Sequence, residues 1–160
     1  MAKVGRAAYA HAKERVTLVT AASTLTANDS GETIVINHAT AFTTTLPAAK
    51  KGQTFRFVIA VASTSPHKIA AASGEYFYGS IRVISTTDNK TSSQAVTKAV
   101  AVADPGDYDH ISLDSNATTS GGVAGDVIEL YCVEDGGWLV SAILTLSTGS
   151  PSSIAVIGAS

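Results

Sequence analysis

The segment QTFRFVIAVA, residues 53–62, constrains the fold more than any other part of the sequence, because its side chains alternate strictly in character. Large apolar residues fall on one face, and Thr, Arg and smaller residues fall on the other. The apolar face comprises Phe55, Phe57, Ile59 and Val61, and the opposite face comprises Thr54, Arg56, Val58 and Ala60. A period of two is typical of a half-buried β-strand. The segment therefore predicts a strand with Arg56 directed away from the core.

The rest of the chain from Val16 onward repeats this organisation in shorter form. Runs of β-branched and aromatic residues are separated by turn residues at intervals of roughly 8–12 residues. Only QAVTKAVAVA, residues 94–103, is also compatible with a helix. The clearest runs are VTLVT (16–20), TIVIN (33–37), FTTTLP (42–47), EYFYGSIRVIS (75–85), HISLD (110–114) and SIAVI (153–157).

These runs predict an all-β fold, a single β-sandwich or barrel-like domain of about ten short strands. We expect an N-terminal arm over residues 1–15, the β-sandwich over 16–146, and a C-terminal tail with a short terminal strand over 147–160. Asp135-Gly136 predicts the turn of a β-hairpin near the C terminus. Segment 75–85 is either a strand pair or one strand with a bulge at Gly79. No repeat of fixed period is visible, which argues against a solenoid.

The first fifteen residues, MAKVGRAAYAHAKER, differ from everything that follows. Their many alanines favour a helix, but a short helix with little apolar surface is marginal alone. Such a segment needs a partner surface to order it, so we interpret it as an arm that docks onto another protein. The alternative is a frayed terminus without a role. The candidate contact residues are Val4, Arg6, Tyr9, His11 and Arg15.

Charged residues make up 15% of the chain, against about 25% in ordinary globular domains. The net charge of −2 provides no basic patch for nucleic acid, and no stretch approaches the roughly 18 apolar residues of a membrane span. A surface of small hydroxyl residues suits contact with protein, because few ions must be desolvated there. The single cysteine, Cys132, cannot form an internal disulfide and is expected to be buried.

No group of residues indicates catalysis, so we expect neither an enzyme nor a cofactor. The sequence lacks a nucleophile motif and a phosphate-binding loop. The four histidines, His11, His38, His67 and His110, lie far apart and are expected in solvated loops. The only candidate metal ligands are Asp104, Asp107, Asp109 and Asp114. Alternate carboxylates in a loop can bind calcium, although a turn at Pro105-Gly106 explains the first two equally well.

A resemblance narrows these expectations. LTANDSGETIVINHATAFTTTLPAAKKGQTFRFVI, residues 25–59, resembles a module of tailed-phage virion proteins, in which a D-S-G turn and a T-L-P-A segment precede G-x-x-F-x-F. The second half of that module has G-D and then a G-x-W-x-V hairpin, to which AGDVIELYCVEDGGWLVSAI, residues 124–143, is similar. The positions that carry the pattern are expected to be structural. They are Gly31, Leu46, Pro47, Gly52 and Trp138.

The resemblance implies a capsid decoration, or cement, protein of a bacteriophage, assembled in the host cytoplasm and placed on the capsid surface of the virion. Its implied partner is the major capsid protein, whose subunits it would bridge, and its implied state is a homo-oligomer, with a trimer favoured. The alternative is a tail- or head-fibre domain that binds a host receptor or glycan. In that case Tyr76, Tyr78 and Tyr108 are the candidates to stack on sugar.

Overall fold

The computed structural model describes residues 15–96, 108–115, 120–147, 151 and 156–158. The strands within these ranges are β1 (Val16–Val19), β2 (Ser23–Thr24), β3 (Thr33–Ile36), β4 (Thr43–Thr45), β5 (Thr54–Ile59), β6 (His67–Ala70), β7 (Tyr76–Ser85), β8 (Thr91–Val96), β9 (His110–Leu113), β10 (Val127–Glu134), β11 (Gly137–Leu146) and β12 (Ile157–Gly158). A 3-10 turn, η1 (Ala27–Asp29), precedes β3. The expected all-β class is confirmed, with twelve strands where about ten were predicted.

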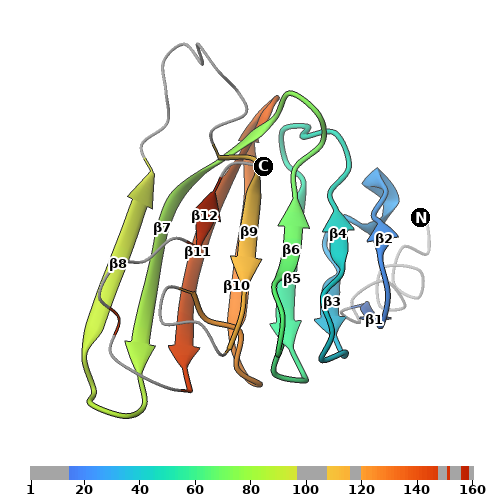
Figure 1. Cartoon of the computed structure of the whole chain (residues 1–160). Helices are drawn as coiled ribbons and strands as arrows, with labels where there is room; N and C mark the ends of the chain where they lie inside the picture. Colours follow the sequence, from blue (N-terminus) through green and yellow to red (C-terminus); the bar gives the residue numbers. More distant parts are fainter. Residues whose placement is uncertain (1–14, 97–107, 116–119, 148–150, 152–155, 159–160) are drawn as a thin grey trace, which may run out of the picture.

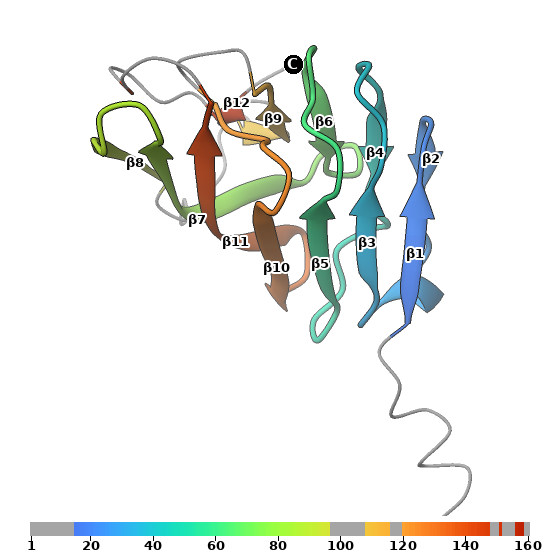
Figure 2. The ribbon, with the colours of Figure 1, turned by 90° about the horizontal axis from the view of Figure 1, so that it is seen from below.

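Two mixed sheets face each other across one hydrophobic core (Figure 1; Figure 2). The larger sheet has the strand order β1-β3-β5-β10-β11-β7-β8, and the smaller has the order β12-β9-β6-β4-β2. Figure 2, which looks along the sandwich from below, shows the smaller sheet as the upper layer and β1, β3, β5, β10 and β11 of the larger sheet as the lower one, with the edge strand β8 rising to the level of the smaller sheet. Among the described residues, no helix is long or apolar enough to cross a membrane.

From β1 to β6 the chain winds as a flat coil. β1, β3 and β5 lie side by side in the larger sheet, β2, β4 and β6 lie side by side in the smaller one, and every pairing is parallel. These six strands follow a coil-like path within the sandwich. Val16 pairs with Thr33, and Thr33 pairs with Arg56, so successive turns differ in length. A coil of this kind needs apolar residues at its inward positions, but its turns need not have equal lengths. The sequence therefore shows no repeat of fixed period.

The predicted alternation of β5 is confirmed. Phe55, Phe57 and Ile59 are buried between the sheets, and Arg56 is exposed on the other side. β5 pairs with β10, which forms an antiparallel hairpin with β11 through the expected turn at Asp135-Gly136. This hairpin carries Trp138, which is fully buried with its ring centroid 5.6 Å from that of Phe55. The coil and the hairpin thus share one core.

The expectation of a strand pair or a bulge at Gly79 is wrong. Segment 76–85 is one continuous strand, β7, and it pairs with β11 without a register shift. Gly79 has φ +124°, and a Cβ there would collide with the backbone of Val140. The glycine therefore allows the backbones of β7 and β11 to approach closely, and it does not mark a bulge. The register shift of the larger sheet lies in β10 instead, between Tyr131 and Glu134.

Several sequence expectations fall wholly or partly outside the described residues. The arm is described only at Arg15, and the ambiguous segment 94–103 is described only to Val96, where it is strand. The expected terminal strand at 153–157 is seen as the two-residue β12, of which only Ile157 falls within that prediction. The boundaries at 15, 146 and 147 therefore remain predictions.

Candidate functional site

Of the candidate metal ligands, the structure describes only Asp109 and Asp114, and these two do not lie together. Asp104 and Asp107 lie outside the described residues. Asp109 and Asp114 flank the two ends of β9, which places their Cα atoms roughly 17 Å apart along the strand. The Asp109 carboxylate lies 2.7 Å from His110 Nδ1. No group of three or more metal-ligating side chains occurs in the part of the chain that the structure describes.

The expectation of solvated histidines is wrong for two of the three that the structure describes. His67 is buried on β6, where its Nε2 lies 2.6 Å from the His38 carbonyl oxygen and its Nδ1 accepts the Phe42 N–H at 3.3 Å. His110 on β9 is also buried. Only His38 is close to the expectation, since it sits in a turn beside Thr40. Two buried histidines with polar partners indicate structural roles. His11 lies outside the described residues.

The tyrosines considered for sugar stacking do not form one exposed platform. Tyr76 is half-buried and Tyr78 is buried, with ring centroids 5.9 Å apart. Tyr108 is exposed but precedes β9, which belongs to the smaller sheet. The three are therefore divided between the two sheets.

The positions that carry the sequence pattern occupy turns and core. Gly31 and Gly52 have positive φ in the turns before β3 and β5. Leu46 is buried directly after β4, and Pro47 follows it. Leu46 and Trp138 lie in the core, whereas Gly31 and Gly52 are exposed turn residues, so the roles that the structure gives these positions are folding roles.

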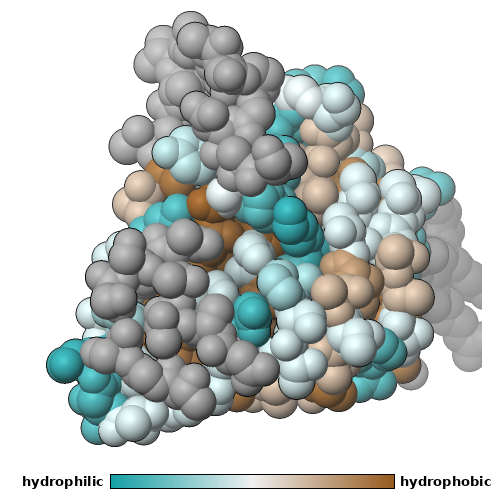
Figure 3. All heavy atoms as spheres, in the orientation of Figure 1, coloured by the Kyte–Doolittle hydropathy of each residue, from teal (hydrophilic) through white to brown (hydrophobic). Residues whose placement is uncertain are grey.

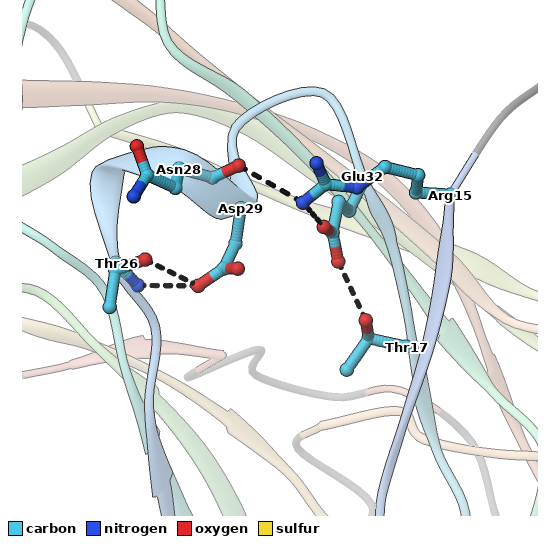
Figure 4. Close-up of polar contacts among 6 residues, drawn as sticks. All are labelled: Arg15, Thr17, Thr26, Asn28, Asp29 and Glu32. Carbon is cyan, nitrogen blue, oxygen red and sulfur yellow. Dashed lines mark hydrogen bonds and ion pairs between the residues drawn. The ribbon is translucent and has the colours of Figure 1, made fainter. Parts of the chain in front are cut away.

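Arg15, the one described member of the arm, is held against the sandwich. Its guanidinium donates to the Asn28 carbonyl oxygen at 3.1 Å and forms an ion pair with the Glu32 carboxylate (Figure 4). Thr17 donates its hydroxyl to the other Glu32 oxygen at 2.6 Å. Glu32 is only 5% exposed. These contacts fix the start of β1 to the turn before β3. Thr26 and Asp29 form a capping box next to them, which holds η1 in place (Figure 4).

The most unusual surface is the side of the larger sheet that is turned away from the core, which we call the outer face. One row of side chains runs across five neighbouring strands, and every member is aliphatic. This aliphatic row consists of Leu18, Val35, Val58, Val127 and Ile143. Its two ends, Leu18 and Ile143, are each 59% exposed, and the three valines between them are half-buried. A contiguous exposed apolar strip marks an interaction surface more often than a scatter of single apolar residues does.

Apart from the exposed Val16 at its start, the neighbouring row of the outer face is made of small or polar residues. It consists of Val16, Thr33, Arg56, Glu129, Ser141, Ser80 and Ala95. Shallow hollows open where the small residues lie. One of about 370 Å³ includes Glu129, Ser141 and Ile143, and another of about 380 Å³ includes Ser80, Ala95 and Ser141. The outer face thus combines an apolar strip with open depressions able to receive side chains of another molecule.

Two side chains with shifted pKa values border the outer face and the β10–β11 hairpin. Tyr131 donates its hydroxyl to the Glu129 carboxylate at 3.0 Å, and this bond raises the pKa of the phenol. At the hairpin turn, Asp135 accepts the Lys51 N–H at 2.8 Å and the Lys50 ammonium at 3.0 Å, which together lower the pKa of its carboxyl. Both groups are exposed and already satisfied, so neither is poised as an acid or a base.

The outer side of the smaller sheet has a different character. Its paired positions are small or polar, and they comprise Thr43, Lys68 and Ser112 in one row and Thr45, Ala70 and His110 in the next. Figure 3, in the orientation of Figure 1, shows pale side chains of intermediate hydropathy over much of the β6, β4 and β2 region. The aliphatic row has no counterpart on the described part of this side.

Sequence reasoning missed the aliphatic row, although a signal was present. Val35 lies between Ile34 and Ile36 in a strand with no polar alternation, and Ile143 lies in an equally apolar run. Unbroken apolar runs in strands indicate that both faces carry apolar side chains. The positions that gather on one face depend on strand pairing, which the sequence does not reveal.

Comparisons of the chain with protein-family models, with curated proteins and with solved structures find no significant match, so the outer face and the sequence resemblance carry the functional argument.

Proposed function

We propose that this chain is a non-enzymatic phage virion protein that decorates the capsid and binds the major capsid protein through the outer face. The observation that carries the proposal is the aliphatic row from Leu18 to Ile143. The resemblance of residues 25–59 and 124–143 to virion modules supplies the class of partner.

The aliphatic row suits a protein partner for two physical reasons. Four of its five members, the three valines and Ile143, are β-branched, so they lose little side-chain freedom on docking. Their burial removes apolar area from water without desolvating a charge. Arg56 and Glu129 are opposite one another in the adjacent row, where they can set the orientation of a partner through charge. A decoration protein gains further from many copies acting together on one lattice.

Phage heads prepared without this protein provide the test. The substitution Ile143→Lys places a charge at an exposed end of the aliphatic row, and Thr43→Lys places the same charge on the smaller sheet as a matched control. We expect Ile143→Lys to abolish co-sedimentation with heads and Thr43→Lys to leave it unchanged. Equal binding by both variants, with folding verified by circular dichroism, would exclude the outer face as the contact surface.

A second candidate, glycan binding by a fibre domain, is favoured by one observation. Tyr131 is 40% exposed and borders a hollow of about 170 Å³ together with Arg56 and Glu129. An aromatic ring beside charged hydrogen-bonding groups is a common way to hold a sugar. Binding on a glycan array that Tyr131→Ala removes would support the fibre role. Binding to heads with no glycan signal would support decoration.

A further inference from the structure

β1 is an edge strand that lacks the usual protection against pairing. In the described part of the chain, it has β3 on one side and no strand on the other. Its four residues, VTLV, contain no charge and no proline, and Val16 and Leu18 are 64% and 59% exposed. Edges of this kind readily accept another strand. The other three edges differ, since β8 is mostly polar and β2 and β12 have two residues each.

In β1, the backbone N–H and C=O groups of two residues point to the open edge of the sheet. Thr33 donates its N–H to the Arg15 carbonyl at 2.8 Å, and Asn37 donates its N–H to the Val19 carbonyl at 2.9 Å. In a parallel strand the N–H and C=O groups of alternate residues point to the same side. Arg15, Thr17 and Val19 therefore bond towards β3. The N–H and C=O groups of Val16 and Leu18 point away from the sheet, along its open edge.

We propose that two copies of this chain pair their β1 strands antiparallel across a two-fold axis at Thr17, which joins the two larger sheets into one. In this register Val16 lies opposite Leu18 of the second copy. Both residues direct their N–H and C=O groups to the open edge. Each such pair exchanges two N–H···O bonds, and the symmetry doubles them. The two Thr17 residues face each other as a non-hydrogen-bonded pair, as the alternation of an antiparallel ladder requires.

The side chains fit the same register on both faces. Val16 and Leu18 both lie on the outer face, so each cross-strand pair sets Leu18, the end of the aliphatic row of one copy, against the exposed Val16 of the other. On the inner face, Thr17 is bonded to Glu32, whose charge is compensated by Arg15 of its own copy. The groups near the two-fold axis are therefore the Arg15–Glu32 ion pairs of the two copies, whose charges are balanced. No charge repulsion opposes the pairing. This self-complementarity in hydrogen bonds, apolar contacts and charge identifies a second copy as the occupant of the edge.

Cysteine cross-linking tests the register, in a Cys132→Ala background that removes the native thiol. The Cα atoms of a non-hydrogen-bonded pair lie about 4.5 Å apart, within the range of a disulfide. The two Val16 positions are about 8–9 Å apart in this register, beyond that range. We expect Thr17→Cys to form a disulfide-linked dimer under mild oxidation and Val16→Cys to form little. Equal cross-linking at both positions, or none at Thr17, would overturn the register.

The mass in solution tests the pairing itself. Light scattering of the full chain at micromolar concentration should give twice its 16.3 kDa. Leu18→Pro removes an N–H that β3 does not use, so it should leave the fold intact and weaken the dimer by about tenfold or more. Ile143→Lys, far from the edge, should leave the dimer unchanged. A monomer, a trimer, or a dimer that survives Leu18→Pro would refute the proposal without bearing on capsid binding. A dimer lost in Ile143→Lys would also refute it, and would instead place the outer face in the contact between copies.

Discussion

Gly79 lies against Val140 so closely that no side chain fits between them. A Cβ at position 79 would be 3.0 Å from the Val140 nitrogen and closer still to its carbonyl oxygen. The two residues are register partners in the parallel pair β7–β11, which joins β7 and β8 to the hairpin. Any larger residue at 79 must force these central strands apart.

Gly79→Ala should lower the free energy of unfolding by about 3 kcal/mol or more, because it adds a backbone clash to an unfavourable positive φ. Urea denaturation followed by Trp138 fluorescence measures this. Gly125→Ala is the matched control, since Gly125 also has a positive φ, +100°, but open space around its Cα. Equal losses in the two variants would mean that φ strain alone matters at 79.

Gly79 also shows where sequence reasoning reaches its limit. The alternation in β5 depends on local residues, so its inner and outer faces could be predicted correctly. A glycine inside an apolar run is equally consistent with a bulge and with a close approach, and only the partner strand decides between them. The same limit applies to the outer face. Val35 and Ile143 are more than one hundred residues apart in sequence, and only strand pairing places them in one row.

Asp126 joins its own loop to β11 through one oxygen that has three donors. Its Oδ2 accepts the N–H groups of Gly122, Val123 and Thr145 at 3.0, 3.0 and 2.9 Å, and its side chain is buried. Asp126→Ala leaves these donors without a partner and should cost about 2–4 kcal/mol. Asp126→Asn can still present an oxygen of weaker acceptor strength and should cost less. Thermal unfolding compares the two, and a smaller effect for alanine than for asparagine would contradict this role.

Cys132 should be unreactive in the folded protein, and ionisation of its thiol should affect stability only at alkaline pH. Burial, with further effects of Asp135 and Glu75, raises the pKa of its thiol above the ordinary 9.0. Because the folded-state pKa is the higher one, the folded state binds more protons above pH 9, and the free energy of unfolding falls as pH rises through that value. Disulfide-exchange labelling should be slow until urea is added. Cys132→Ala should have a flatter stability profile above pH 9, and an identical slope would exclude the thiol as the cause.

The Arg15–Glu32 pair should contribute more to stability than the Lys50–Asp135 pair, although both join distant segments of chain. Glu32 is 5% exposed, so removal of its partner leaves a poorly solvated carboxylate, to which Thr17 donates among the described residues. Lys50 and Asp135 are 66% and 59% exposed, and water replaces either partner at little cost. We expect Arg15→Ala to cost about 1–2 kcal/mol and Lys50→Ala to have no measurable effect on the urea midpoint. The double variant Arg15→Ala/Glu32→Gln should recover part of the loss, because it removes the stranded charge. If the double variant is less stable than Arg15→Ala alone, Glu32 stabilises the start of β1 through Thr17 and not through the ion pair.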